Sequence, residues 1–63
     1  MNDRYLKLAG EKITDRNILI SIASKRAKEL ARGANAMVPV DRSGEVAVNY
    51  LDVALREISE GKI

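Results

Sequence analysis

The chain is 63 residues long, it contains no cysteine and no histidine, and its formal net charge is +2. The missing residue types exclude disulfides and the common thiolate zinc sites, and they remove the commonest metal ligand and the usual general base at neutral pH. A net charge of +2 is also far below the basic excess of a dedicated nucleic-acid-binding domain.

A chain of this length forms one small domain, residues 1–63, with a thin core. Such a domain buries only about 60% of the surface that its unfolded form exposes. Apolar residues make up 46% of the chain, and most of them are Ala, Ile, Leu and Val. We therefore expect closely packed helices, with a partner as the source of additional stability.

The first predicted helix runs from residue 3 to about residue 11. Tyr5, Leu6 and Ala9 recur at helical spacing, and the polar residues at positions 2 and 3 are suited to cap its start. Gly10 weakens its end, because glycine is a poor helix former.

The second predicted helix runs from about Asp15 to Arg32, with Thr14 as the expected N-cap and Gly33 at the C-terminal cap position. A surface helix needs an apolar stripe only a little wider than about 100°. The apolar residues of this helix spread over an arc of about 220°: Ile18, Leu19, Ile20, Ile22, Ala23, Ala27, Leu30 and Ala31. It therefore has more apolar surface to bury than two short neighbours cover.

The connector, from about residue 35 to residue 48, is predicted to be extended. Pro39 disfavours helix at the residue before it, and the run DRSG at 41–44 is a turn pattern. The flanking segments 37–40 and 45–48 are rich in valine, so the connector has a hairpin-like pattern.

The third predicted helix runs from about Asn49, which caps it, to Glu60, and Gly61 closes it. One of its faces is apolar: Tyr50, Leu51, Ala54, Leu55 and Ile58. The predicted fold class is all-α, a small three-helix domain with an extended, hairpin-like connector before the last helix.

Arg26 falls inside the apolar arc of the second helix, beside Ile22 and Leu30. An unpaired buried charge is very unfavourable, so the guanidinium needs a carboxylate or several carbonyl groups. Two arrangements meet this need equally well, an internal pair with Glu57 and a contact to another chain. In a third, the long side chain reaches water at the edge of the domain.

No catalytic, metal-binding or cofactor-binding pattern is present. Lys25, Lys28 and Arg32 line the polar side of the second helix, but Glu29 lies among them, so a solvated face is favoured over a phosphate-binding ridge. Three carboxylates of the last helix are interpreted as solvated charges: Asp52, Glu57 and Glu60. The chain has no apolar run of about 18 residues and no signal peptide, so we expect a cytoplasmic location.

Two stretches resemble a known family. Residues 11–16 (EKITDR) lead into 23–30 (ASKRAKEL) and Gly33-Ala34, and residues 53–63 (VALREISEGKI) follow the connector. In order and spacing they are similar to the omega subunits of bacterial RNA polymerase, a family with a counterpart in archaeal and eukaryotic polymerases. The resemblance covers about two-thirds of the chain.

The resemblance implies a non-catalytic subunit that wraps the C-terminal part of the largest polymerase subunit (beta prime) and assists its folding and recruitment. It implies no cofactor. Read with the apolar arc, it predicts these partner-binding residues: Arg16, Ile22, Arg26, Ala27, Leu30, Ala54 and Glu57. Some members also bind the alarmone guanosine tetraphosphate near the N-terminus, but residues 1–4 do not match that site, so no ligand residues are assigned.

Two other classes of protein compete with this interpretation. A small DNA-binding module would use the three cations of the second helix, and its affinity would fall steeply with salt. A self-associating helical protein would bury its excess apolar surface against a second copy of itself.

Overall fold

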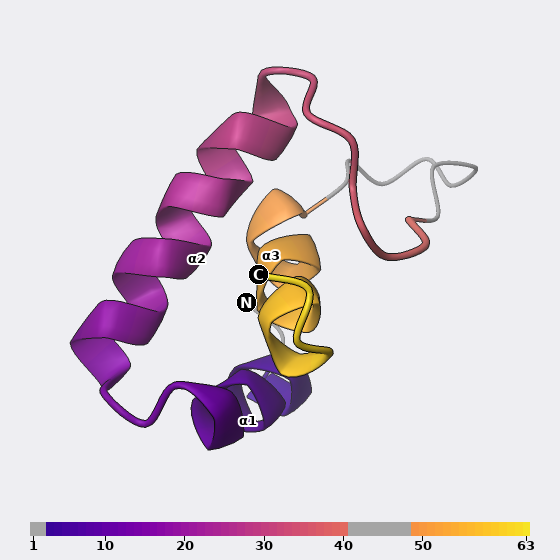
Figure 1. Ribbon diagram of the computed structural model, residues 1–63. Helices are drawn as coiled ribbons and strands as arrows, with labels where there is room; N and C mark the ends of the chain where they lie inside the picture. Colours follow the sequence, from indigo (N-terminus) through magenta and orange to yellow (C-terminus); the bar gives the residue numbers. More distant parts are fainter. Residues whose placement is uncertain (1–2, 41–48) are drawn as a thin grey trace.

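The last helix, α3 (Tyr50–Ser59), is the central element of the computed structural model, and the other two helices pack against it (Figure 1). These are α1 (Asp3–Lys12) and α2 (Arg16–Ala31), which contact each other far less than either contacts α3. α2 leads away from α1, and α3 returns in the opposite direction. The structure describes residues 3–40 and 49–63, and that part contains no strand. The predicted all-α class is confirmed.

α1 continues through Gly10 to Lys12, one residue beyond its predicted end. The amide of Ile13 still donates to the carbonyl of Ala9 at 3.0 Å, so helical hydrogen bonding passes the glycine. Ala9 is fully buried against the other helices. Tertiary packing of this kind outweighs the low helix propensity of one glycine.

The N-cap of α2 is Asp15, and the prediction that Thr14 caps this helix is wrong. Asp15 has an extended backbone, and its Oδ1 accepts from the amides of Asn17 at 2.9 Å and Ile18 at 3.1 Å. A carboxylate at this position satisfies two free amides and also complements the helix dipole, which a threonine hydroxyl does only in part. Asn49 caps α3 through its side-chain oxygen, as predicted.

A glycine with left-handed backbone follows each of the last two helices. The φ angle is 106° at Gly33 and 71° at Gly61. After α3, the amide of Lys62 donates back to the carbonyl of Glu57 at 2.9 Å, and the amide of the glycine donates to the preceding turn. This arrangement satisfies carbonyls that the end of a helix leaves free, and it confirms both predicted cap positions.

Within residues 3–40 and 49–63, seven buried side chains from all three helices form one core cluster: Ala9, Leu19, Ala23, Leu30, Ala54, Leu55 and Ile58. Three of the seven are alanines, so the helix backbones approach closely while little apolar area is buried. Leu51 packs against this cluster from a half-buried position. The core is therefore thin, as the composition indicates.

The part of the connector that the structure describes is not a strand. Met37 and Val38 form a bend, and Val38 is buried. The amide of Met37 donates to the side chain of Glu57 instead of a neighbouring strand, which gives the physical reason for the bend. The first arm of the predicted hairpin is therefore wrong, and the turn and second arm, residues 41–48, lie outside the described residues.

We expect Leu55→Ala to lower the free energy of unfolding by about 2–5 kcal/mol, because it removes a fully buried side chain and leaves a cavity. Ile18→Ala on α2 is the control, because Ile18 is 52% exposed and its loss should change stability by less than about 0.5 kcal/mol. Urea unfolding followed by circular dichroism measures both. Equal losses for the two variants would contradict the assigned core.

Candidate partner interface

An ion pair between Arg26 of α2 and Glu57 of α3 joins the two helices. Nε of Arg26 donates to Oε1 of Glu57 at 2.6 Å, and Nη2 donates to Oε2 at 3.2 Å. The side chain of Glu57 is fully buried, whereas that of Arg26 is 15% exposed. Of the arrangements open to Arg26, the structure adopts the internal pair with Glu57.

The same pair holds the start of the connector. The amide of Met37 donates to Oε2 of Glu57 at 2.7 Å, and Nη2 of Arg26 donates to the carbonyl of Asn35 at 2.8 Å. We call Arg26, Asn35, Met37 and Glu57 the charge network. Among the described residues, no buried side-chain nitrogen or oxygen lacks a hydrogen-bond partner. The network therefore ties α2, α3 and the connector together through one satisfied carboxylate.

The interpretation of Glu57 as a solvated charge is wrong. Its three neighbours on the buried face of α3 are Ala54, Leu55 and Ile58, so it points into the fold with the apolar residues. Glu60, by contrast, is exposed and pairs with Arg56 at 2.8 Å one turn away. The signal that separates the two carboxylates is helical position together with the need of Arg26 for a buried partner.

Burial and hydrogen bonding act in opposite directions on Glu57. Burial of the carboxyl group raises its pKa, and the hydrogen bonds from Arg26 and from the amide of Met37, with the positive charge of Arg26, lower it by more. The pKa of Glu57 therefore lies below its usual value of 4.5. The hydrogen bond to Glu57 raises the pKa of Arg26 above its usual value. Both groups are ionised at neutral pH.

The structure places the predicted partner-binding residues in two groups. Arg16 is exposed, and Ile22, Arg26 and Ala27 are half-buried. These four side chains therefore keep part of their surface accessible to a partner. The other three lie inside the fold: Leu30, Ala54 and Glu57. In this conformation the side chains of the second group have almost no accessible surface with which to contact a partner.

Large apolar side chains remain exposed on different elements. Ile18 on α2 is 52% exposed and Met37 on the connector is 45% exposed. Leu8 and Ile63 are exposed as well. Sequence reasoning placed Ile18 in the apolar arc but did not assign it to the interface, because the width of the arc alone does not say which side α3 covers.

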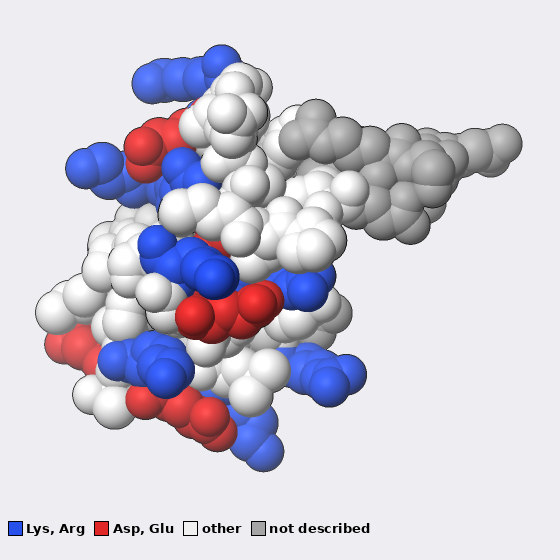
Figure 2. All heavy atoms as spheres, turned by 45° about the vertical axis from the view of Figure 1, so that its right-hand side comes forward, with Lys and Arg blue, Asp and Glu red and all other residues white. Residues whose placement is uncertain are grey.

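The cations of α2 share their surface with acidic groups. Lys25, Lys28 and Arg32 are exposed, and so is Glu29 among them. Figure 2 shows Lys and Arg side chains beside Asp and Glu across the face it presents, without a large area of one sign. This distribution supports the solvated interpretation of the cations.

Two further findings concern the described residues alone. Residues 3–40 and 49–63 contain no group of three or more Asp and Glu side chains arranged to hold a metal ion. None of the helices in this part of the chain has the length and apolar character that crossing a membrane requires.

Residues 10–63 match the family model described as RNA polymerase Rpb6, and the chain belongs to that family of RNA polymerase subunits. Its bacterial relatives are named DNA-directed RNA polymerase subunit omega. The protein of Sulfurovum sp. (strain NBC37-1) is 45% identical over 56 residues, which cover 87% of this chain and 78% of the relative.

Two other bacteria have relatives with the same name. The protein of Campylobacter concisus is 45% identical over 60 residues, covering 95% of this chain and 76% of the relative. The protein of Clostridium botulinum (strain Loch Maree) is 43% identical over 53 residues, which cover 84% of this chain and 67% of the relative. No solved structure matches the chain with significance. The resemblance to bacterial omega subunits, read from the motifs, is confirmed.

We expect Glu57→Gln to destabilise the isolated chain by about 3 kcal/mol, because the amide nitrogen replaces one acceptor oxygen, so at least one of the three donors loses its acceptor, and the part-buried guanidinium of Arg26 loses its counter-charge. The matched control is Glu60→Gln on the same helix. Its exposed pair with Arg56 should contribute less than about 0.5 kcal/mol. Urea unfolding of both variants tests this, and a loss of similar size for each would contradict the role of the network.

The charge network also predicts a loss of stability in acid. Because the pKa of Glu57 is lower in the folded chain than its ordinary value of 4.5, its contribution is fully present above that value. This contribution is lost as the pH falls from 4.5 through the lower pKa of the folded chain. In that range the carboxyl group of Glu57 is protonated in the unfolded chain while it is still ionised in the folded chain, so acid favours unfolding.

Between the two pKa values, this group adds a slope of at most about 1.4 kcal/mol per pH unit to the free energy of unfolding. Glu57→Gln should remove that slope, and Glu60→Gln should retain it. Urea unfolding from pH 7 to pH 3 measures the difference, with an osmolyte added so that both variants are folded at neutral pH. Parallel curves for the wild type and Glu57→Gln would contradict the assignment.

Proposed function

We propose that this chain is a non-catalytic subunit of DNA-directed RNA polymerase that binds the C-terminal part of the largest (beta prime) subunit and promotes its folding and assembly. The family of the chain and the names of its relatives support a place in the polymerase complex. The mode of action is supported by a small core beside exposed apolar side chains. A subunit of this kind acts through buried surface, because binding stabilises both partners by mass action.

The observation that carries the proposal is the exposure of large apolar side chains by a domain that has few to bury. Ile18, Ile22 and Arg26 follow one another at one-turn spacing on α2. Arg26 then bonds to the connector two residues before Met37. We call Ile18, Ile22, Arg26 and Met37 the α2 face. A helical stripe joined to an anchored loop is a surface that a larger protein can cover.

The charge network prepares this face before binding. Glu57 holds the amide of Met37 at 2.7 Å, and Arg26 holds the carbonyl of Asn35 at 2.8 Å. These two bonds fix the positions of Asn35 and Met37 relative to α2 and α3. A segment that is already in its bound conformation loses less conformational entropy on binding, so its contacts contribute more of their energy to affinity.

The predicted interface residues divide into two roles under this proposal. Arg16, Ile22, Arg26 and Ala27 contact the large subunit through their accessible parts. The buried residues hold that surface in shape: Leu30, Ala54 and Glu57. The side chain of Arg26 does both, because its Nε and Nη2 serve the network while 15% of its surface remains exposed.

The remaining parts of the proposal follow from the partner. The chain has no activity of its own, does not contact nucleic acid, and is cytoplasmic, at the nucleoid with the polymerase. The mixture of charges along α2 supports the absence of a nucleic-acid contact. No residue is assigned to guanosine tetraphosphate, and the first two residues of the N-terminus lie outside the described part of the chain.

The test is a titration of the purified large subunit with the chain and with the double variant Ile18→Asp, Met37→Asp. We expect the affinity to fall at least about tenfold, because two charges replace apolar contacts that the partner covers. Both sites are exposed, so circular dichroism should show an unchanged fold. The control is Ser21→Asp, an exposed position on the polar side of the same helix, which should bind as the wild type does.

Equal affinity of the double variant and the wild type would contradict the α2 face as the interface. Failure of the wild-type chain to bind the large subunit at all would overturn the proposed function. If sedimentation then showed a dimer of the chain that the double variant does not form, the exposed apolar side chains would serve self-association.

A further inference from the structure

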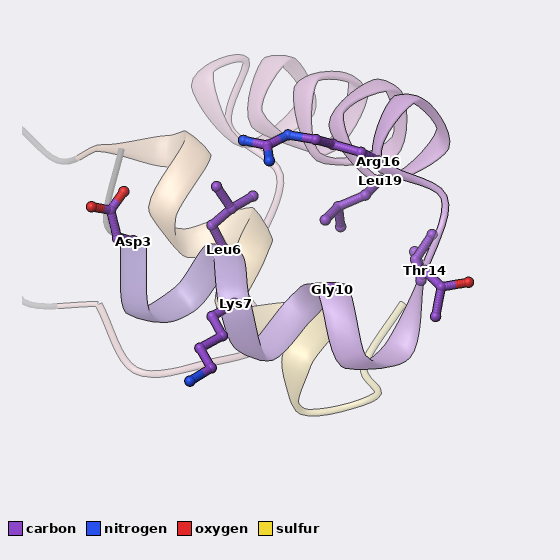
Figure 3. A pocket seen from close by; sticks show the side chains of 8 residues that line it. Asp3, Leu6, Lys7, Gly10, Thr14, Arg16 and Leu19 are labelled. Atoms are coloured by element: carbon purple, nitrogen blue, oxygen red, sulfur yellow. The ribbon is translucent and has the colours of Figure 1, made fainter.

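An open hollow of about 380 Å³ lies between α1 and the start of α2, on a different part of the surface from the charge network. Its walls are apolar at Leu6, Ile13 and Leu19, and Gly10 lies between them on α1. In Figure 3, the side chains of Leu6 and Leu19 point toward each other from the two helices. The side chain of Arg16 extends over the gap between them.

Gly10 is not explained by the fold of the chain. Its backbone is helical and its φ is not positive, so the turn does not require glycine. A Cβ added at this position meets no atom within 4 Å. Glycine is nevertheless among the least favourable residues in a helix interior, and alanine is the most favourable. The described part of the fold would therefore accept alanine at this position.

We propose that this hollow seats a segment of the large polymerase subunit that brings an apolar side chain against Leu6 and Ile13, its close approach allowed by Gly10, and a carboxylate to Arg16. The inference rests on the proposed function and adds a second contact region to the α2 face. The apolar walls fit an aliphatic side chain. The missing Cβ lets the incoming chain lie against the helix backbone, which is a common use of glycine.

The charges around the hollow favour an acidic segment. Three charged side chains line it, Asp3, Lys7 and Arg16, so the basic groups exceed the acidic group by one. Arg16 is exposed, and among the described residues it makes neither an ion pair nor a side-chain hydrogen bond. Its planar guanidinium has the geometry to bind a carboxylate with two hydrogen bonds.

The first experiment measures stability and binding for Gly10→Ala in the full chain. The substitution should raise the midpoint of thermal unfolding by about 2 to 6 °C, because alanine favours the helix and meets no other atom. It should weaken binding to the purified large subunit by about tenfold, because an added methyl group overpacks a filled site. Opposite changes in the two quantities are the expected result.

Ser21→Ala is the matched control, because it also raises helix propensity but lies at an exposed position outside the hollow. It should stabilise the chain and leave the affinity unchanged. Wild-type affinity for Gly10→Ala would overturn the inference while leaving the proposed function intact. Absence of binding by the wild-type chain would instead remove the proposed function on which the inference depends.

A second pair of variants tests the charge. Arg16→Glu places a carboxylate in the first turn of α2, where it favours the helix dipole, so the fold is retained. We expect it to weaken binding at least about tenfold, and more than Lys28→Glu, which reverses an exposed charge on the same helix away from the hollow. Equal losses for the two variants would overturn the acidic occupant. Dimerisation of the chain that Gly10→Ala abolishes would identify a second copy as the occupant and overturn the inference.

Discussion

Burial of the Glu57 carboxylate is the constraint on which the arrangement of this small fold depends. A fully buried charge is strongly destabilising unless its oxygens are satisfied, and here three donor groups satisfy them, two from Arg26 and one from the amide of Met37. The donors come from α2 and from the connector, while the carboxylate belongs to α3. A shift of any one of these elements would break a hydrogen bond to a buried carboxylate.

Such a network contributes more to a unique arrangement than to the total stability. Buried ion pairs are often no better for stability than well-packed apolar side chains, although the loss of one partner is severe. Three of the seven residues in the described core cluster are alanines, which bury little apolar area and therefore contribute little packing energy. The directional hydrogen bonds of the charge network therefore fix the relative positions of α2 and α3, which a thin apolar core specifies only weakly. They also fix the path of residues 35–37 next to α2.

The α2 face and the hollow lie at different places around the central helix, α3. The α2 face ends at the connector, where the charge network orders Met37. The hollow lies beside the first turn of α2, between that turn and α1. Because α3 packs against both other helices, it holds the two surfaces in a defined relation.

Local sequence determined the elements of this protein, and tertiary packing decided the role of its charged and apolar side chains. The helices, the cap at Asn49 and the left-handed glycines follow from short-range patterns, because caps and periodicity act within a few residues. The cap of α2 was misassigned because Thr14 and Asp15 are both good caps, and only the backbone conformation distinguishes them. The bend at Met37, the burial of Leu30 and the pairing of Glu57 depend on contacts 20 to 31 residues away in the chain, such as Met37 with Glu57 and Arg26 with Glu57. Helical spacing says which residues share a face of one helix, but only the packed structure decides which face another helix covers.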